Sequence, residues 1–118
     1  MCSQAFPRSA RLLTGADYRR VFEQPRRSSD RYFTVLYRPS GRDSARLGLA
    51  VAKKRLKRAV DRNRIKRLIR ESFRQQRDSL KGLDIVVLVK PGIEKADNRT
   101  LLEALRNHWR HLSRDTRP

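Results

Sequence analysis

The side chains in this sequence best suited to chemistry are cations, and they gather in one segment. Residues 53–77 hold 12 basic and 2 acidic residues. Arg binds phosphate groups through paired hydrogen bonds, and Lys adds a compact positive charge. Asn63, near the middle of the segment, carries an amide that can bind a phosphate, a ribose hydroxyl or a base edge. The segment is therefore suited to binding a polyanion.

Groups for catalysis or metal binding are scattered. The 12 acidic residues stand singly, without the paired carboxylates that hold Mg²⁺ in nucleases. His108 and His111 have no Cys or acidic residue at a spacing that would complete a zinc site. The single cysteine, Cys2, cannot form an internal disulfide. We expect no catalytic residue and no metal site in the polypeptide itself.

The overall charge supports the same interpretation. The chain has 118 residues, a net charge of +18 and a pI of about 11.6, with 37% hydrophobic residues. This length predicts one domain over residues 1–118. Nucleic acid and an anionic membrane surface are the two polyanions to consider, and the excess of Arg over Lys suits nucleic acid, although a GC-rich genome produces the same excess. The sequence contains no run of apolar residues long enough to span a membrane. Residues 1–20 carry no apolar segment of the signal-peptide type, so we do not expect secretion.

A helix over residues 59–80 positions the cations. Ile65, Leu68, Ile69 and Phe73 recur at helical spacing and predict a buried stripe. Like charges at this spacing destabilise an isolated helix, so a polar row without compensating Glu favours a docking surface over a merely solvated face. That row on the opposite side of the helix consists of Asn63, Lys66, Arg67, Arg70, Arg74 and Arg77.

The remaining pattern predicts a small sheet covered by helices. A short helix ending before Pro25 places Tyr18, Val21 and Phe22 on one face. Residues 32–38 and 46–52 read as an antiparallel pair of strands, and 84–90 as a strand buried on both faces. A last helix, capped by residue 97 or 98, follows. We expect an α+β fold, with residues 1–11 and 113–118 irregular or flexible.

One motif in the basic helix resembles a family signature. Arg62-Asn63-Arg64 followed by Lys66-Arg67 resembles the hallmark of the bacterial ribonuclease P protein component. The similarity continues in order over roughly residues 6–112. Its flanking pieces are Phe6-Pro7-Arg8, Arg11-Leu12, Asp17-Tyr18, Val21-Phe22, Leu47-Gly48-Leu49, Lys53-Lys54 and Asp84-Ile85-Val86-Val87.

The resemblance implies a particular fold. It is a single-domain α/β sandwich, with a small mixed central sheet and three helices in the order α-β-β-β-α-β-α. It also implies a left-handed βαβ crossover around the basic helix, where general rules favour a right-handed one. The pattern alone lacks one of the three early strands, and we expect that short strand within residues 53–59.

The resemblance also implies a function. In this family the RNA subunit of ribonuclease P performs the chemistry with Mg²⁺, in the cytoplasm. The protein binds that RNA and the single-stranded 5′ leader of precursor tRNA, with no DNA or membrane partner, and so promotes removal of the leader. The residues that would contact the RNA subunit are Arg62, Asn63, Arg64, Lys66, Arg67 and Arg70, with Lys53, Lys54 and Arg74 extending the patch.

The leader would lie in a cleft between the first helix and the sheet. The resemblance assigns its walls to Tyr18, Phe22, Phe33 and Tyr37. Core packing is the plainer role for Phe33, both roles suit Phe22, and the phenol groups favour the cleft because burying a hydroxyl without a partner is costly. The family often has hydroxyl side chains where Ala50 and Ala52 stand.

Two other functions fit the composition. A ribosomal or RNA-chaperone protein would bind many structured RNAs and lack the leader cleft. A DNA-binding protein would place the basic helix in a major groove, although aromatic residues on a sheet suit single strands better. Competition between duplex DNA and folded RNA would separate these alternatives.

Overall fold

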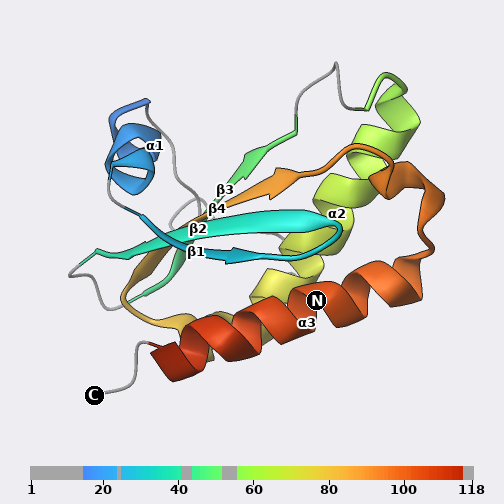
Figure 1. The fold of residues 1–118 in the computed structure, drawn as a ribbon. Helices are drawn as coiled ribbons and strands as arrows, with labels where there is room; N and C mark the ends of the chain where they lie inside the picture. The colour runs from blue at the N-terminus through green and yellow to red at the C-terminus, as the bar shows by residue number, and fades with distance from the viewer. Residues whose placement is uncertain (1–14, 24, 41–43, 52–55, 116–118) are drawn as a thin grey trace, which may run out of the picture.

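The computed structural model describes residues 15–23, 25–40, 44–51 and 56–115. Within them the element order is the one that the resemblance implied (Figure 1). The elements are α1 (Gly15–Phe22), β1 (Arg26–Ser29), β2 (Phe33–Pro39), β3 (Arg46–Ala50), α2 (Ala59–Gln76), the 3₁₀ turn η3 (Arg77–Leu80), β4 (Leu83–Val89), the 3₁₀ turn η4 (Ile93–Lys95) and α3 (Asn98–Asp115). No helix in the described ranges is both long and apolar enough to cross a membrane.

The sheet has the strand order β1-β2-β4-β3. β4 lies between β2 and β3, antiparallel to the first and parallel to the second. The expected antiparallel pairing of β2 with β3 is therefore wrong. The reason is the composition of β4, which is apolar on both faces and becomes buried on both only at the centre of the sheet. The parallel β3-α2-β4 crossover is present, and its left-handedness stays a prediction.

The short third strand is β1, so its expected place within residues 53–59 is wrong. β1 has the sequence RRSS and pairs antiparallel with β2 through its backbone. It has no apolar alternation by which the sequence could reveal a strand. Charged side chains are typical of a short edge strand, because they oppose pairing with another chain.

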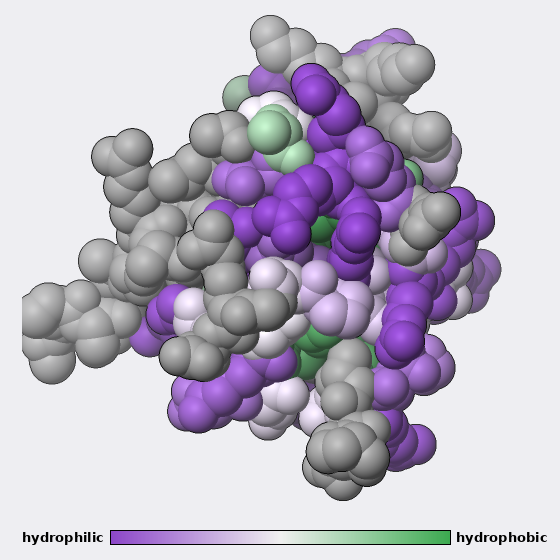
Figure 2. Space-filling view, turned by 90° about the vertical axis from the view of Figure 1, so that its left-hand side faces the viewer, coloured by the Kyte–Doolittle hydropathy of each residue, from purple (hydrophilic) through white to green (hydrophobic). Residues whose placement is uncertain are grey.

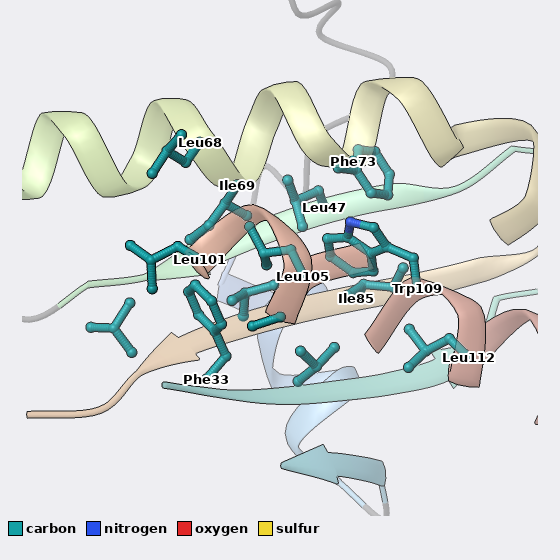
Figure 3. Packing of buried hydrophobic residues seen from close by; sticks show 14 of the residues in the cluster. Phe33, Leu47, Leu68, Ile69, Phe73, Ile85, Leu101, Leu105, Trp109 and Leu112 are labelled. Carbon is teal, nitrogen blue, oxygen red and sulfur yellow. The ribbon is translucent and has the colours of Figure 1, made fainter. Parts of the chain in front are cut away.

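The helices form separate layers on the two faces of the sheet. α2 and α3 cover one face and α1 lies on the other (Figure 1). The main core lies between the sheet and α2/α3, where Phe33, Ile85, Leu105 and Trp109 are packed together (Figure 3). A small second cluster under α1 is built on Val21, with Leu36 and Val86 from the sheet.

A glycine follows the end of the α2 segment, and side-chain hydrogen bonds hold both ends of α3. α2 passes into η3, and Gly82 then adopts a φ of 83°, a conformation that favours glycine. Asp97 caps α3, because its Oδ1 accepts a hydrogen bond of 2.8 Å from the Thr100 amide. α3 continues to Asp115, so the expectation of irregular structure is wrong for 113–115. The Asp115 carboxylate accepts a hydrogen bond from the hydroxyl of Tyr37, which fastens this last turn to the sheet.

Candidate nucleic-acid interface

The outward face of α2 carries a row of positive charge. Five side chains lie along it, and we call them the α2 stripe: Asn63, Lys66, Arg67, Arg70 and Arg74. The opposite side of the helix is buried in the core by residues such as Ile65 and Ile69, and this burial directs the stripe away from the sheet. Lys66, Arg67 and Arg70 make no ion pair with any described carboxylate.

The two arginines of the Arg-Asn-Arg motif have partners within the protein. Arg62 donates to the carbonyl oxygens of Leu56 and Lys57, at 2.8 and 2.9 Å, and so fixes the segment that enters α2. Arg62 and Arg64 lie on the flanks of the helix, outside the α2 stripe, because each is adjacent in sequence to Asn63 and successive residues of a helix point in different directions. Their contact with RNA stays a prediction.

Arg64 joins α2 to the beginning of α3. Its guanidinium group donates to Asn98 Oδ1 at 2.6 Å, to the Glu94 carbonyl at 3.0 Å and to the Ala96 carbonyl at 3.3 Å. A fork of fixed N–H donors suits this arrangement of several acceptors. Arg64 is therefore a tertiary clamp in this structure.

Phe33 and Tyr37 do not line a cleft, which corrects the expectation from the sequence. Phe33 is 0% and Tyr37 2% exposed, and both lie in the core beneath α3. The Tyr37 hydroxyl donates to Asp115 Oδ2 at 2.8 Å. Burial, followed by the hydrogen bond to Asp115, raises the pKa of Tyr37 to about 12. The partner that a buried phenol needs is supplied by the end of α3, 78 residues away along the chain.

The face of β2 on the α1 side carries the residues that alternate with Phe33 and Tyr37 along the strand. Because side chains alternate across a strand, Thr34 and Leu36 lie on this face together with Ala50 and Leu88 from the neighbouring strands. Thr34, Ala50 and Leu88 are only partly buried. Sequence reasoning had not assigned Thr34 and Leu88 to the site. They could have been identified from the sequence if the sheet face covered by α1 had been known.

The two aromatic residues of α1 occupy different positions. Tyr18 is half-buried against the sheet, and its ring contacts the backbone at Gly48. Phe22, at the end of the helix, is 45% exposed, an unusual exposure for a large hydrophobic side chain in this protein. The structure therefore brings Tyr18 and Phe22 to the same side of the sheet as Ala50, and away from Phe33 and Tyr37.

Two arginines hold α1 in place. Arg46 is buried and makes a bidentate contact to Asp84, at 2.9 and 2.8 Å, with Asp17 of α1 at 3.5 Å. The hydrogen bonding to Asp84 raises the pKa of Arg46, against the opposing effect of burial. Arg38 donates to the carbonyls of Arg20 and Glu23 at the carboxyl end of α1, where a positive charge is favourable. Both cations serve the fold.

Three residues named from the sequence cannot be placed on this surface. Lys53, Lys54 and Ala52 lie outside the described residues. No group of three or more His, Cys, Asp or Glu that could hold a metal ion occurs in the described ranges. On the side where α1 lies, hydrophilic residues cover most of the described surface, with only small hydrophobic spots (Figure 2).

Comparison with known proteins places this arrangement in a family. The family model named Ribonuclease P matches residues 6–113. The ribonuclease P protein component of Pectobacterium atrosepticum is 52% identical over 114 residues, which cover 97% of this chain and 96% of that protein. That of Thioalkalivibrio sulfidiphilus is 49% identical, over 93% of this chain and 92% of the relative.

Solved structures agree with the sequence relatives. The RNase P protein from Thermotoga maritima superposes with a TM-score of 0.76 at 34% identity, covering 86% of this chain and 96% of that one. The Staphylococcus aureus RNase P protein gives a TM-score of 0.77 at 29% identity, covering 83% and 90%. With its basic α2, its mixed four-stranded sheet and these relatives along nearly its whole length, this chain belongs to the bacterial ribonuclease P protein family.

Proposed function

We propose that this protein binds the RNA subunit of ribonuclease P through the α2 stripe and receives the 5′ leader of precursor tRNA beside α1. The family is the protein component of an endoribonuclease that processes tRNA. The observation that carries the proposal is the outward row of cations on α2, three of which have no described carboxylate as a partner. Each such cation can displace a counterion from an RNA phosphate, which favours binding.

The leader site that we propose differs from the one expected from the sequence. It consists of Tyr18 and Phe22 on α1, with Thr34, Ala50 and Leu88 on the adjoining sheet face. An exposed aromatic ring offers a stacking surface for unpaired bases, worth ~1–3 kcal/mol per base and largely independent of sequence. The small side chain of Ala50 leaves room for a strand to approach the sheet. Such a surface suits leaders of variable sequence.

We assign the cleavage chemistry to the RNA subunit. Mg²⁺ bound by that RNA supplies the charge stabilisation for phosphodiester hydrolysis. The polypeptide positions the RNA subunit and the leader, and endonucleolytic removal of the leader produces the mature 5′ end of the tRNA. The proposed site of action is the cytoplasm.

Reconstitution tests this function. The protein, a bacterial ribonuclease P RNA and a precursor tRNA are mixed at low Mg²⁺, with protein alone and RNA alone as controls. We expect cleavage at the mature 5′ end only in the complete mixture. Binding of RNA without any rescue of cleavage would favour a general structured-RNA-binding protein instead. Cleavage by the protein alone would overturn the assignment of chemistry to the RNA.

A matched pair of variants tests the α2 stripe itself. Arg67→Gln with Arg70→Gln removes two charges from the stripe, and Arg31→Gln with Arg99→Gln removes two exposed charges elsewhere. For the stripe variant we expect the slope of log binding constant against log salt concentration to become shallower by about 2. The control variant should change it by less than about 1. Equal changes would mean that only the total charge matters.

A further inference from the structure

A groove lies between α2 and α3, and the proposed function leaves it unused. It has a volume of about 270 Å³. We call it the α2–α3 groove and define it by Gln76, Ser79, Arg106, Arg110 and Arg114. Gln76 ends α2 and Ser79 lies in η3, whereas the three arginines come from α3.

The floor of the groove is held in a fixed position. Trp109 lines the groove although it is only 1% exposed. Its indole Nε1 donates a hydrogen bond of 2.8 Å to Ser72 Oγ. Its ring packs edge to face against Phe73, with the ring centroids 5.9 Å apart (Figure 3). These contacts join α2 and α3 beneath the groove. The groove therefore has a floor that is fixed by contacts between the two helices.

The groove extends along the seam between the helices. A second hollow of about 160 Å³ shares Gln76 and Arg106 with the first and continues to Glu71 and Gln75. The two hollows together make an elongated depression, which suits a chain-like ligand better than a small compact one. Glu71 is the only carboxylate among the residues that line either hollow, and it lies at the end away from Arg110 and Arg114.

The wall formed by α3 carries uncompensated positive charge. Arg106, Arg110 and Arg114 follow one another at four-residue spacing, ~6 Å apart along the helix axis. This repulsive arrangement destabilises an isolated helix, as on α2. The carboxylates of α3 are engaged elsewhere: Glu103 pairs with Arg99 at 4.0 Å, and Asp115 binds Tyr37 and Arg26. No described carboxylate forms an ion pair with the three arginines.

We propose that the α2–α3 groove is a second RNA-binding site, which holds a backbone segment of the ribonuclease P RNA. The regular arginine row offers paired hydrogen bonds to successive phosphates. The opposite wall is uncharged, and the Gln76 amide and Ser79 hydroxyl can bind ribose 2′-hydroxyl groups. The polar walls make the groove unsuitable for an apolar ligand.

The position of the groove identifies which RNA it holds. α2 and α3 cover the face of the sheet opposite α1 (Figure 1). A leader lying beside α1 is therefore separated from the groove by the sheet. The α2 stripe belongs to the same helical layer as the groove, so an RNA bound to the stripe can continue across Gln75 toward α3. This inference rests on the proposed function, because it takes the RNA subunit as the ligand of α2.

The test measures assembly with the intact RNA subunit. The variant combines Arg106→Gln, Arg110→Gln and Arg114→Gln. We expect its slope of log binding constant against log salt concentration to be shallower by about 2–3 than that of the unaltered protein. The matched control combines Arg31→Gln, Lys95→Gln and Arg99→Gln, which removes the same charge from exposed positions outside the groove. It should change the slope by less than about 1.

A second pair of variants leaves the arginines intact. Ser79→Asp places a carboxylate in the groove, and Asn107→Asp places one on the exposed side of α3 outside it. We expect the first to weaken assembly and the second to have little effect. Thermal unfolding of every variant monitors the fold. Removing three repelling charges should leave the melting temperature of the groove variant unchanged or raised, so weaker assembly would not arise from unfolding.

The outcomes separate the groove from the proposed function. Equal slopes for the groove variant and the unaltered protein, or equal changes for groove and control variants, would overturn the second site. Normal assembly with weaker binding of precursor tRNA would assign the groove to the substrate and equally overturn it. Failure of the unaltered protein to bind the RNA subunit would instead contradict the proposed function.

Discussion

The ring of Tyr18 lies directly against the backbone of Gly48. A Cβ atom at Gly48 would stand 2.6 Å from Tyr18 Cε1 and 2.9 Å from its hydroxyl oxygen, closer than real side chains approach. The missing side chain therefore sets how near α1 can come to β3. Together with the contact of Asp17 to Arg46, it fixes the helix that carries two of the five residues of the proposed leader site.

Replacing Gly48 should disturb that site through Tyr18. Gly48→Ala overpacks the contact, and such changes cost ~1–3 kcal/mol of stability. We expect a lower free energy of unfolding and weaker binding of the leader, with assembly onto the RNA subunit retained. Denaturant unfolding and binding of precursor and mature tRNA measure the two effects. In a Tyr18→Ala background the cost in stability should shrink, and an identical cost in both backgrounds would contradict the contact.

Elements with a local residue pattern could be predicted from the sequence. The apolar stripe of α2, the burial of β4 on both faces and the cap of α3 all follow from the local pattern around residues such as Ile65, Val87 and Asp97. The errors arose where long-range contacts decide. β1 has no apolar pattern and forms only because it pairs with β2. In β2, both alternating sets of side chains contain apolar residues, so the sequence does not show which face lies against α3 and receives the Tyr37 side chain.

The same distinction applies to the candidate site. The α2 stripe could be predicted because helical periodicity separates it from the core. The contacts of Arg62 and Arg64 within the protein could not be predicted, because most of their acceptors are backbone carbonyls, such as those of Leu56 and Glu94, which carry no signature in the sequence. A residue type that suits phosphate also suits carbonyl oxygens.

Arg64 should therefore behave as a structural residue. Arg64→Gln removes the fork that joins α2 to the start of α3, and we expect a loss of ~1–3 kcal/mol in the free energy of unfolding. Arg67→Gln should leave stability nearly unchanged. In RNA-subunit binding the order reverses: Arg67→Gln makes the salt slope shallower by about 1, and Arg64→Gln changes it less. Equal changes of the salt slope in the two variants would indicate that Arg64 contacts the RNA.

Tyr37 provides a test of the corrected leader site. Tyr37→Phe keeps the ring in the core and removes the hydrogen bond to Asp115, so we expect a loss of ~1 kcal/mol in stability. Binding of the leader, measured as the difference in affinity between precursor and mature tRNA, should not change. A marked loss of that difference would show that the phenol reaches the leader after all.

Phe22 should show the opposite behaviour. Its ring is half exposed, so Phe22→Ala should cost little stability. Loss of one stacking surface should weaken binding of precursor tRNA by ~1–3 kcal/mol and leave mature tRNA unaffected. Phe22→Tyr keeps the ring and serves as the matched control. Equal weakening of precursor and mature tRNA would contradict a role at the leader.

His108 should make the stability of the protein depend on pH. It is 4% exposed, with Nδ1 2.7 Å from Ser28 Oγ and Nε2 3.0 Å from Asp30 Oδ2. Burial lowers the pKa of His108, with further lowering by His111 and Lys90, although Asp30 acts in the opposite direction. The unfolded chain therefore binds a proton at higher pH than the folded protein does.

The sign of the effect follows from this difference. As pH falls through the unfolded pKa, ~6.5, protons bind preferentially to the unfolded chain, so the free energy of unfolding should decrease until the lower folded pKa is passed. Denaturant unfolding at pH 7.5 and 5.5 measures the decrease. His108→Gln keeps a hydrogen-bonding side chain beside Ser28 but cannot titrate. Asp97 and Asp115, whose pKa values are lowered, lose their contribution only at more acidic pH and are present in both proteins. The decrease between pH 7.5 and 5.5 should therefore be smaller in the variant, and an equal decrease in both proteins would show that His108 is not its source.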